Sequence, residues 1–224
     1  MNLDQEKLIA AKEAVKYVKN GMTVGLGTGS TAAHMVNELG ELVKNGLEIV
    51  GVPSSESTKK LATEKGIPLT TLEKANSIDV YIDGADEFDP YMQLIKGGGG
   101  ALLREKILTY NSELVIIIAD SQKEVKRLGD FKLPVETIPF ATKKIEQSLQ
   151  KMGLQPKLRV KNDENFVTDE GNYILDLNIK HITNIPALES RLNQIPGIVE
   201  TGLFLDMADM IIIGKGENAI TLKK

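Results

Sequence analysis

Apolar positions in the first part of the chain follow two different spacings. Leu8, Ala11, Val15 and Val18 recur every three or four residues, which predicts an amphipathic helix near residues 4–19. Short apolar runs typical of buried strands follow it, separated by further helical segments. We expect strands at residues 23–26, 47–52, 67–70, 77–82, 91–96 and 114–119, and helices at 32–43, 57–65 and 101–110. This alternation predicts an α/β fold with a doubly wound, mostly parallel, Rossmann-like sheet.

The pattern changes near residue 131. Strands are predicted at 133–138, 156–161 and 198–203, a hairpin at 166–179, and helices at 141–152 and 186–193. This order of elements matches the ferredoxin-like split βαβ arrangement. We therefore expect two domains. Residues 1–130 plus 205–224 would form the Rossmann-like catalytic domain, with a buried strand at 209–214 that returns to the main sheet. Residues 131–204 would form a small ferredoxin-like α+β domain for packing and oligomerisation.

Composition narrows the classes of function. The 224 residues are 42% hydrophobic and 26% charged, which is ordinary for a globular protein. The absence of cysteine excludes disulfides, a thiolate nucleophile and a zinc–thiolate site, and two distant histidines, His34 and His181, do not suggest a metal site. A net charge of −4 provides no basic field for nucleic acid. The acidic N-terminus and the lack of an apolar run near ~18 residues argue against a signal peptide and a membrane span, so we expect a cytoplasmic protein.

A glycine-rich turn, G-T-G-S-T at residues 27–31, joins the first predicted strand to the next helix. Free backbone N–H groups, the helix dipole and side-chain hydroxyls converge at such a turn, which favours a phosphate cradle. Residues 27–32 also match the dinucleotide fingerprint G-x-G-x-x-A. However, the second predicted strand ends in P-S-S, without the acid that holds a ribose. A dinucleotide site and a purely structural turn therefore remain as alternatives.

Two acids follow the predicted strand 77–82. Asp83 and Asp86 fall on the turn at its carboxyl end, where open α/β sheets place their ligand crevice. The same acids, with Glu87 and Asp89 nearby, would also suit a solvated acidic loop or a magnesium site, although their spacing does not match the EF-hand pattern. Catalysis or sugar binding is the interpretation we favour for this turn.

The next predicted strand ends at Lys96 and is followed directly by four glycines, Gly97–Gly100. Such a run makes sense where backbone N–H groups come close to a ligand, and the helix that follows aims its positive end at the same place. Glu105 lies on that helix; by itself, it would more often belong to a solvated face. Lys123 follows the strand at 114–119 and is a candidate contact for an anion.

These groups are suited to proton transfer. A carboxylate removes a proton beside a carbonyl when nearby donors stabilise the oxyanion that develops, while a phosphate cradle holds the substrate in register. This chemistry converts an aldose phosphate into a ketose phosphate through an enediolate. A glutamate base beside an electrophile is also the arrangement found in triosephosphate isomerase.

Five sequence blocks resemble the ribose-5-phosphate isomerase type A family in their order and spacing. They are G-L-G-T-G-S-T-A-A-H at 25–34, Y-I-D-G-A-D-E at 81–87, M-Q-L-I-K-G-G-G-G-A-L-L-R-E-K at 92–106, L-P-V-E at 133–136 and I-P-G-I-V-E-T-G-L-F at 195–204. The blocks extend over nearly the whole chain. The combination of D-G-A-D with K-G-G-G is far more specific than a glycine loop alone.

The resemblance implies a role for each matching residue. Glu105 falls on the general base that moves the proton between C1 and C2, and Asp83 on the acid tied to ring opening. Asp86 and Lys96 fall on groups that hold the sugar oxygens and the enediolate. The substrate-binding positions are Thr28, Gly29, Ser30, Thr31, Gly84, Ala85, Gly97, Gly98, Gly99, Lys123 and Lys7. Gly100 departs from the alanine expected there, which loosens the helix start slightly.

The resemblance also implies a reaction and an assembly. The family interconverts D-ribose 5-phosphate and D-ribulose 5-phosphate in the non-oxidative pentose phosphate pathway, as homodimers or homotetramers that need no cofactor. Two rival functions remain. A sugar-phosphate sensor would carry a helix-turn-helix, whereas this chain starts on its first sheet-packing helix. An acyl or coenzyme A transferase of related fold would use a glutamate as a nucleophile.

Overall fold

The computed structural model describes residues 2–224. They divide into two compact units, the first made of residues 2–85, Arg104–Glu124 and Asp206–Lys224, and the second of Asp86–Leu103 and Val125–Leu205. The boundary falls inside the D-G-A-D motif, between Ala85 and Asp86.

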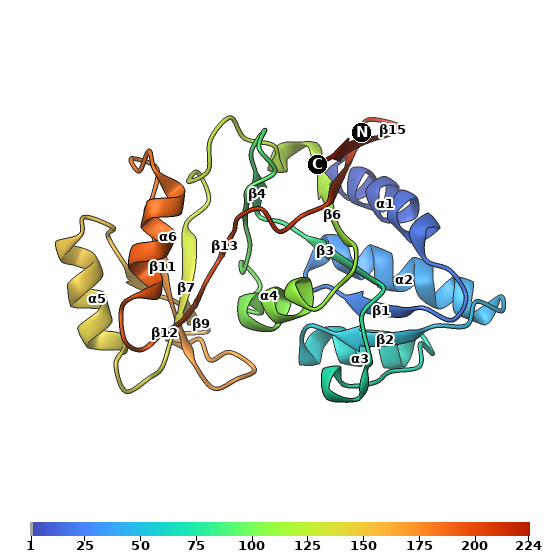
Figure 1. The fold of residues 1–224 in the computed structure, drawn as a ribbon, viewed down its shortest axis with the longest axis horizontal. Coiled ribbons are helices and arrows are strands. Elements are labelled where there is room, and N and C mark those ends of the chain that lie inside the picture. The colour runs from blue at the N-terminus through green and yellow to red at the C-terminus, as the bar shows by residue number, and fades with distance from the viewer. Residues whose placement is uncertain (1) are drawn as a thin grey trace. The chain divides into compact units, whose positions relative to one another are not determined.

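The first unit contains a six-stranded sheet in the order β15-β14-β6-β3-β1-β2 (Figure 1). Its strands are β1 (Thr23–Leu26), β2 (Val50–Pro53), β3 (Val80–Gly84), β6 (Val115–Asp120), β14 (Met210–Lys215) and β15 (Asn218–Lys223). Five of them are parallel, and β15 pairs antiparallel with β14 at the edge. The sequence order and the sheet order differ, as in a doubly wound α/β sheet, which confirms the predicted fold class.

Helices alternate with these strands. They are α1 (Leu3–Ala14), α2 (Ser30–Lys44), α3 (Glu56–Glu64) and α4 (Leu102–Tyr110), with short 3₁₀ turns η1 (Val15–Tyr17), η2 (Leu72–Lys74) and η3 (Ser121–Lys123). The start of α1 has a capping box, in which Asn2 and Gln5 each satisfy the other's backbone N–H. Figure 1 shows α1 and α2 side by side along the sheet, and both helices contact its strands.

The core of this unit lies between the sheet and the pair α1 and α2. Alternate residues of four strands point into it, namely Val24, Leu26, Val80, Ile82, Ile116, Ile118, Met210 and Ile212. Because successive side chains of a strand point to opposite faces, Tyr81 and Asp83 lie on the other face of β3. The strand period therefore separates the apolar face of β3 from the face that bears the predicted acid.

The second unit has a four-stranded antiparallel sheet in the order β12-β7-β11-β8. Its elements are β7 (Leu133–Thr137), α5 (Thr142–Lys151), β8 (Lys157–Leu158), β11 (Tyr173–Leu177), α6 (Ile185–Asn193) and β12 (Ile198–Thr201). This order and pairing is the ferredoxin-like arrangement expected from the sequence. A three-stranded sheet of β4 (Glu87–Phe88), β5 (Leu94–Ile95) and β13 (Leu203–Phe204) belongs to the same unit.

Several element predictions were wrong in detail. The strand expected at 67–70 is only an isolated bridge from Leu69 to Gly51. The hairpin lies earlier than predicted, between β9 (Val160–Lys161) and β10 (Glu164–Asn165). Its two turn residues have the positive φ of 52° and 62° that a type I′ turn requires, and Asn and Asp tolerate this conformation.

Two further differences concern the main sheet. Asp83 lies within β3 and not on the turn after it, because β3 continues to Gly84 by pairing with β6. The edge strand β15 was missed altogether. Its sequence, N-A-I-T-L-K, mixes polar and apolar residues and none of them is buried, so it lacks the continuous apolar run that reveals the buried strands. No helix among residues 2–224 is long and apolar enough to cross a membrane.

Close packing of α1 on β14 generates a stability prediction. A Cβ atom built at Gly214 would lie 1.9 Å from the backbone oxygen of Glu6. Gly214→Ala should therefore lower the free energy of unfolding by about 3 kcal/mol, because backbone cannot yield as a flexible side chain does. Urea denaturation measures the change. The exposed neighbour provides the control, since Lys215→Ala should shift the stability by less than about 0.5 kcal/mol; equal stability of the two variants would contradict the close approach.

Candidate active site

The carboxylate of Asp83 is fully buried at the carboxyl end of β3. Its Oδ1 accepts hydrogen bonds from the backbone N–H of Thr28 at 3.0 Å and of Gly84 at 2.7 Å. Its Oδ2 accepts a short hydrogen bond from the hydroxyl of Tyr81. A buried carboxylate needs such donors, since an unpaired charge in an apolar interior is strongly unfavourable. Asp83 thereby joins the glycine-rich turn to β3.

The glycine-rich turn approaches Asp83 so closely that only glycine fits. A Cβ atom at Gly27 would lie 2.2 Å from Oδ1 of Asp83. Tyr81 supports the carboxylate from the same face of β3. Burial raises the pKa of the Tyr81 phenol well above its ordinary value of 10.0, and the negative charges of Asp83 and Glu105 raise it further. The phenol therefore stays protonated and keeps donating to Asp83.

A cluster of hydroxyl groups lies beside the same turn. The Oγ1 of Thr28 is 2.7 Å from Oγ of Ser54, 2.8 Å from Oγ of Ser55 and 3.1 Å from Oγ1 of Thr58. Thr58 also donates to the carbonyl of Gly27 at 2.9 Å. The side chain of Thr28 thus belongs to a network that links β1 to α3. The sequence prediction missed Ser54, Ser55 and Thr58.

Glu105 lies in the first turn of α4, with a side chain that is buried and only 3% exposed. Its carboxylate is near enough to Tyr81 to raise the pKa of that phenol. Thr109 donates to the backbone carbonyl of Glu105 at 2.8 Å, one turn further along the helix. The predicted base is therefore buried and does not lie on a solvated helix face.

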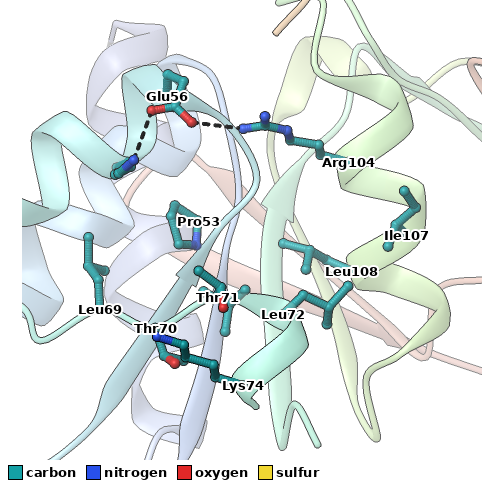
Figure 2. Close-up of a pocket in the computed structure, with 12 residues that line it drawn as sticks. Pro53, Glu56, Leu69, Thr70, Thr71, Leu72, Lys74, Arg104, Ile107 and Leu108 are labelled. Carbon is teal, nitrogen blue, oxygen red and sulfur yellow. Dashed lines mark hydrogen bonds and ion pairs between the residues drawn. The ribbon is translucent and has the colours of Figure 1, made fainter. Parts of the chain in front are cut away.

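Arg104, the residue before Glu105, lies on a different face of α4. Arg104 donates to Oε1 of Glu56 on α3 at 3.1 Å, and this bond lowers the pKa of Glu56. Figure 2 shows the two side chains facing each other, with Ile107 and Leu108 of α4 on the wall of the same pocket. Consecutive helix residues point about 100° apart, because there are 3.6 residues per turn. Arg104 therefore faces α3, while Glu105 is buried.

The pocket in Figure 2 has a volume of about 530 Å³. It is lined by Val52, Pro53, Glu56, Lys59, Leu69, Thr70, Thr71, Leu72, Lys74, Arg104, Ile107 and Leu108. The predicted catalytic residues Asp83 and Glu105 do not line it. The pocket therefore lies on the Arg104 side of α4 and is separate from the buried carboxylates.

Two predicted cations lie on segments that Glu6 ties together. Glu6 accepts from the N–H of Ser121 at 3.0 Å and from its hydroxyl at 2.6 Å, and from the N–H of Gly216 at 3.0 Å. These bonds lower the pKa of Glu6, the Ser121 hydroxyl most of all. They hold η3, which ends at Lys123, against α1, which bears Lys7.

Lys7 itself reaches the glycine-rich turn. Its Nζ donates to Oγ of Ser30 at 3.1 Å. Gly29 has a φ of 107° and precedes the first residue of α2, so the turn ends at a helix N-terminus. Gly29 and Ser30 are exposed, while Thr31 is buried in the first turn of α2. An ammonium, a hydroxyl and a helix N-terminus at one place suit a phosphate group.

The second unit holds the remaining predicted residues. Asp86 accepts a hydrogen bond from the N–H of Gly98 at 2.7 Å, so that amide is committed to a carboxylate. Lys96 is buried, with Nζ 5.3 Å from the centroid of the Phe204 ring. The glycines follow directly, and Gly97 and Gly100 have φ values of 100° and 84° that favour glycine. Gly98 and Gly99 are exposed.

The predicted residues thus form two groups. The first unit contains Lys7, Thr28–Thr31, Asp83–Ala85, Glu105 and Lys123, and the second contains Asp86, Lys96 and Gly97–Gly99.

Tyr81 could have been found from its spacing, because residues two apart in a strand share a face. Glu6 gave no such signal, since an acid in the first turn of an amphipathic helix is normally exposed. Among residues 2–224 no group of three or more His, Cys, Asp or Glu side chains is suited to a metal ion.

A doubly wound α/β sheet with a buried carboxylate at a strand end, beside a glycine-rich turn, and a second buried carboxylate on α4 is an arrangement suited to an enzyme that transfers protons. Residues 50–218 match the family model described as ribose 5-phosphate isomerase A (phosphoriboisomerase A). The chain belongs to this family.

Relatives and solved structures agree with the match. The chain is 49% identical to ribose-5-phosphate isomerase A of Ruegeria pomeroyi, over 99% of this chain and 87% of the relative. A solved D-ribose-5-phosphate isomerase in complex with phospho-erythronic acid is 42% identical, with a TM-score of 0.96 and full coverage of both chains. The enzyme of Methanocaldococcus jannaschii is 41% identical, with a TM-score of 0.94 and full coverage of both chains.

The hydrogen bonds of Glu6 generate a pH-dependent prediction. The folded-state pKa of Glu6 lies below its usual value of 4.5, so the folded protein is stabilised by the ionised carboxylate. Glu6→Gln should lower the free energy of unfolding by about 1 kcal/mol at pH 7. The difference should persist down to the unfolded-state pKa and shrink as the pH falls through the folded-state value. Urea denaturation between pH 7 and pH 3 measures it.

The exposed Glu64 of α3 provides the matched control, because Glu64→Gln removes one charge without removing these bonds. A stability difference for Glu6→Gln that is constant over the whole pH range would contradict a stabilising carboxylate.

Proposed function

We propose that the protein is an aldose–ketose isomerase that interconverts D-ribose 5-phosphate and D-ribulose 5-phosphate through an enediolate. Membership of the family supports this reaction, and the similarity to a relative of that name extends over 99% of the chain. The observation that carries the mechanism is the buried carboxylate of Glu105, close enough to Tyr81 to raise its pKa, with Tyr81 bonded to Asp83. A carboxylate excluded from water is a stronger base toward carbon than a solvated one.

Glu105 removes the proton from C2 of the open-chain aldose. The electrons of the C–H bond form the C1–C2 double bond, and the aldehyde oxygen becomes the negative oxygen of the enediolate. Glu105 then returns the proton to C1, while the hydroxyl proton passes from O2 to O1, so that a ketone remains at C2. One carboxylate thus serves as base and then as acid.

Other groups have supporting roles. Asp83 assists ring opening and the transfer of the hydroxyl proton. Asp86 and Lys96 hold the sugar oxygens, and the ammonium of Lys96 stabilises the enediolate charge. Lys7 and the turn at Thr28–Thr31 bind the phosphate.

Further positions complete substrate binding. Gly84, Ala85 and Gly97–Gly99 lie beside the sugar, where the N–H groups of Gly84 and Gly98 hold the carboxylates of Asp83 and Asp86. Lys123 offers a further cation. The bonded pair of Lys7 and Ser30, at 3.1 Å, supports an anion site at the turn.

The solved relative with phospho-erythronic acid supports the substrate class. That ligand is a phosphorylated sugar acid, which belongs to the same chemical class as a pentose phosphate. The rival functions, a sugar-phosphate sensor and an acyl or coenzyme A transferase, gain no support from the matched family.

We also propose that the enzyme acts in the non-oxidative pentose phosphate pathway of the cytoplasm, which its membership of the family supports. The proposal extends also to the assembly, in which the chain forms a homodimer or homotetramer and the ferredoxin-like unit serves packing and oligomerisation. No cofactor takes part, because proton transfer and charge stabilisation are supplied by side chains and backbone groups.

Replacement of the base tests the mechanism. Glu105→Gln keeps the shape of the side chain and removes its basicity, so kcat for ribose 5-phosphate should fall by at least about 10³-fold with KM changed little. A coupled assay for ribulose 5-phosphate measures both constants. A chelator should leave the wild-type rate unchanged.

The exposed Glu113 of the same unit is the matched control, and Glu113→Gln should retain the wild-type rate. A Glu105→Gln variant with normal kcat would show that another group is the base. Loss of activity with chelator would indicate a metal-assisted reaction instead.

A further inference from the structure

The glycine run of the second unit is held in place by one arginine. Arg159 lies between β8 and β9, and its Nη1 donates to the carbonyl oxygen of Gly97 at 2.8 Å and to that of Gly98 at 3.2 Å. These two residues follow Lys96 directly. Neither composition nor motif spacing singled out Arg159, because it lies more than fifty positions from the glycines in the sequence.

Arg159 is itself tightly held. Its guanidinium makes two bonds to the carboxylate of Asp176 on β11, from Nε at 2.9 Å and from Nη2 at 2.5 Å. Both side chains are mostly buried, with 14% and 19% of their surface exposed. The backbone of Arg159 bonds to Ile174 and to Phe166. The planar, two-pronged geometry of arginine fits such a carboxylate and leaves one nitrogen for the glycine carbonyls.

The glycine run is also fixed from its other sides. The N–H of Gly98 donates to Asp86 at 2.7 Å, and a Cβ atom at Gly98 would lie 2.5 Å from that carboxylate. Gly100 lies against the ring of Phe166, where a Cβ atom would be 2.4 Å away. The same ring lies 5.8 Å from the guanidinium carbon of Arg159.

These contacts determine which way the peptide groups face. A trans peptide is planar, so its N–H points opposite to its C=O. The peptide between Gly97 and Gly98 is held at both ends, by Arg159 at the oxygen and by Asp86 at the nitrogen. In the next peptide Arg159 binds the oxygen of Gly98, so the N–H of Gly99 must point away from Arg159. Gly99 is exposed, and its N–H is thus available to a ligand.

We infer that Arg159 is a positioning residue for the isomerisation. Its bonds to two glycine carbonyls turn the N–H of Gly99 outward as a donor for a substrate oxygen. Asp176 holds the guanidinium in the required plane. The inference rests on the proposed function, in which the glycine run contributes to substrate binding. It adds a residue that touches neither the substrate nor the reacting atoms.

Such a residue has a kinetic signature. Without Arg159 the run would still be held by Asp86 and by the bond from the N–H of Gly100 to the carbonyl of Gly97, but the carbonyl of Gly98 would lose its partner. Glycines have many accessible backbone conformations, so the N–H of Gly99 would have the productive direction for a smaller part of the time. Arg159→Ala should lower kcat for ribose 5-phosphate by about 10–100-fold, a part of the loss caused by removing an oxyanion donor outright. KM should change by less than about threefold, since the phosphate contacts remain.

Three companion measurements sharpen the test. Arg159→Lys keeps the charge but loses the two-pronged geometry, so it should also lower kcat. Free guanidinium, at concentrations far below those that unfold proteins, should restore part of the activity of Arg159→Ala. Arg127 of the same unit donates to the carbonyl of Ile182, away from the glycine run, and is the matched control. Arg127→Ala should keep the wild-type kcat and should not respond to guanidinium.

The outcomes separate this inference from the proposed function. A normal kcat for Arg159→Ala, together with an inactive Glu105→Gln, would overturn the role of Arg159 alone. A normal kcat for Glu105→Gln would overturn the proposed mechanism. If Arg159→Ala and Arg159→Lys lose activity only in proportion to a loss of folded protein, seen by circular dichroism, and guanidinium restores none, then Arg159 is a stability residue and the inference fails.

Discussion

The buried carboxylate of Asp83 is the interaction on which the first unit's site depends. A charge removed from water must be compensated by directed donors. Here they come from the phenol of Tyr81 and from the backbone N–H groups of Thr28 and Gly84. Because these donors lie on β3 and on the turn after β1, one carboxylate fixes two segments that are far apart in the sequence. Gly27 permits this approach because it has no side chain.

Each unit has an ion pair that adjoins groups of the predicted site. In the first unit, Arg104 of α4 pairs with Glu56, while its neighbour Glu105 is buried on another face of the helix. An exposed pair of this kind contributes at most about 1 kcal/mol of stability, so the buried residues of α4, Leu102 and Leu108 among them, hold the helix in place. In the second unit, Asp176 holds Arg159, which binds the carbonyls of the glycine run. The flexible glycine run is thus held in one direction by Arg159, which is itself held by Asp176 on a strand.

The sequence predicted the parallel sheet, the ferredoxin-like order and most helices, because buried strands and amphipathic helices leave strong periodic patterns. It failed where the pattern is weak. Residues 67–70, I-P-L-T, form only one bridge, and β15, half of whose residues are polar, pairs along its whole length with β14. In both cases the available partner strand decided the outcome. The shift of Asp83 into β3 has the same origin, since pairing with β6 extends the strand.

Residue types and their local spacing were enough to identify the acids, the lysines and the glycines that carry the family motifs, because chemistry restricts these positions to few amino acids. The sequence alone therefore determined the family and the candidate residues. It did not determine that Glu105 is buried, that the hydroxyl of Thr28 joins Ser54, Ser55 and Thr58, or that Arg159 reaches Gly97. Only the tertiary structure decided these contacts, because each joins segments whose separation in the chain leaves no periodic trace.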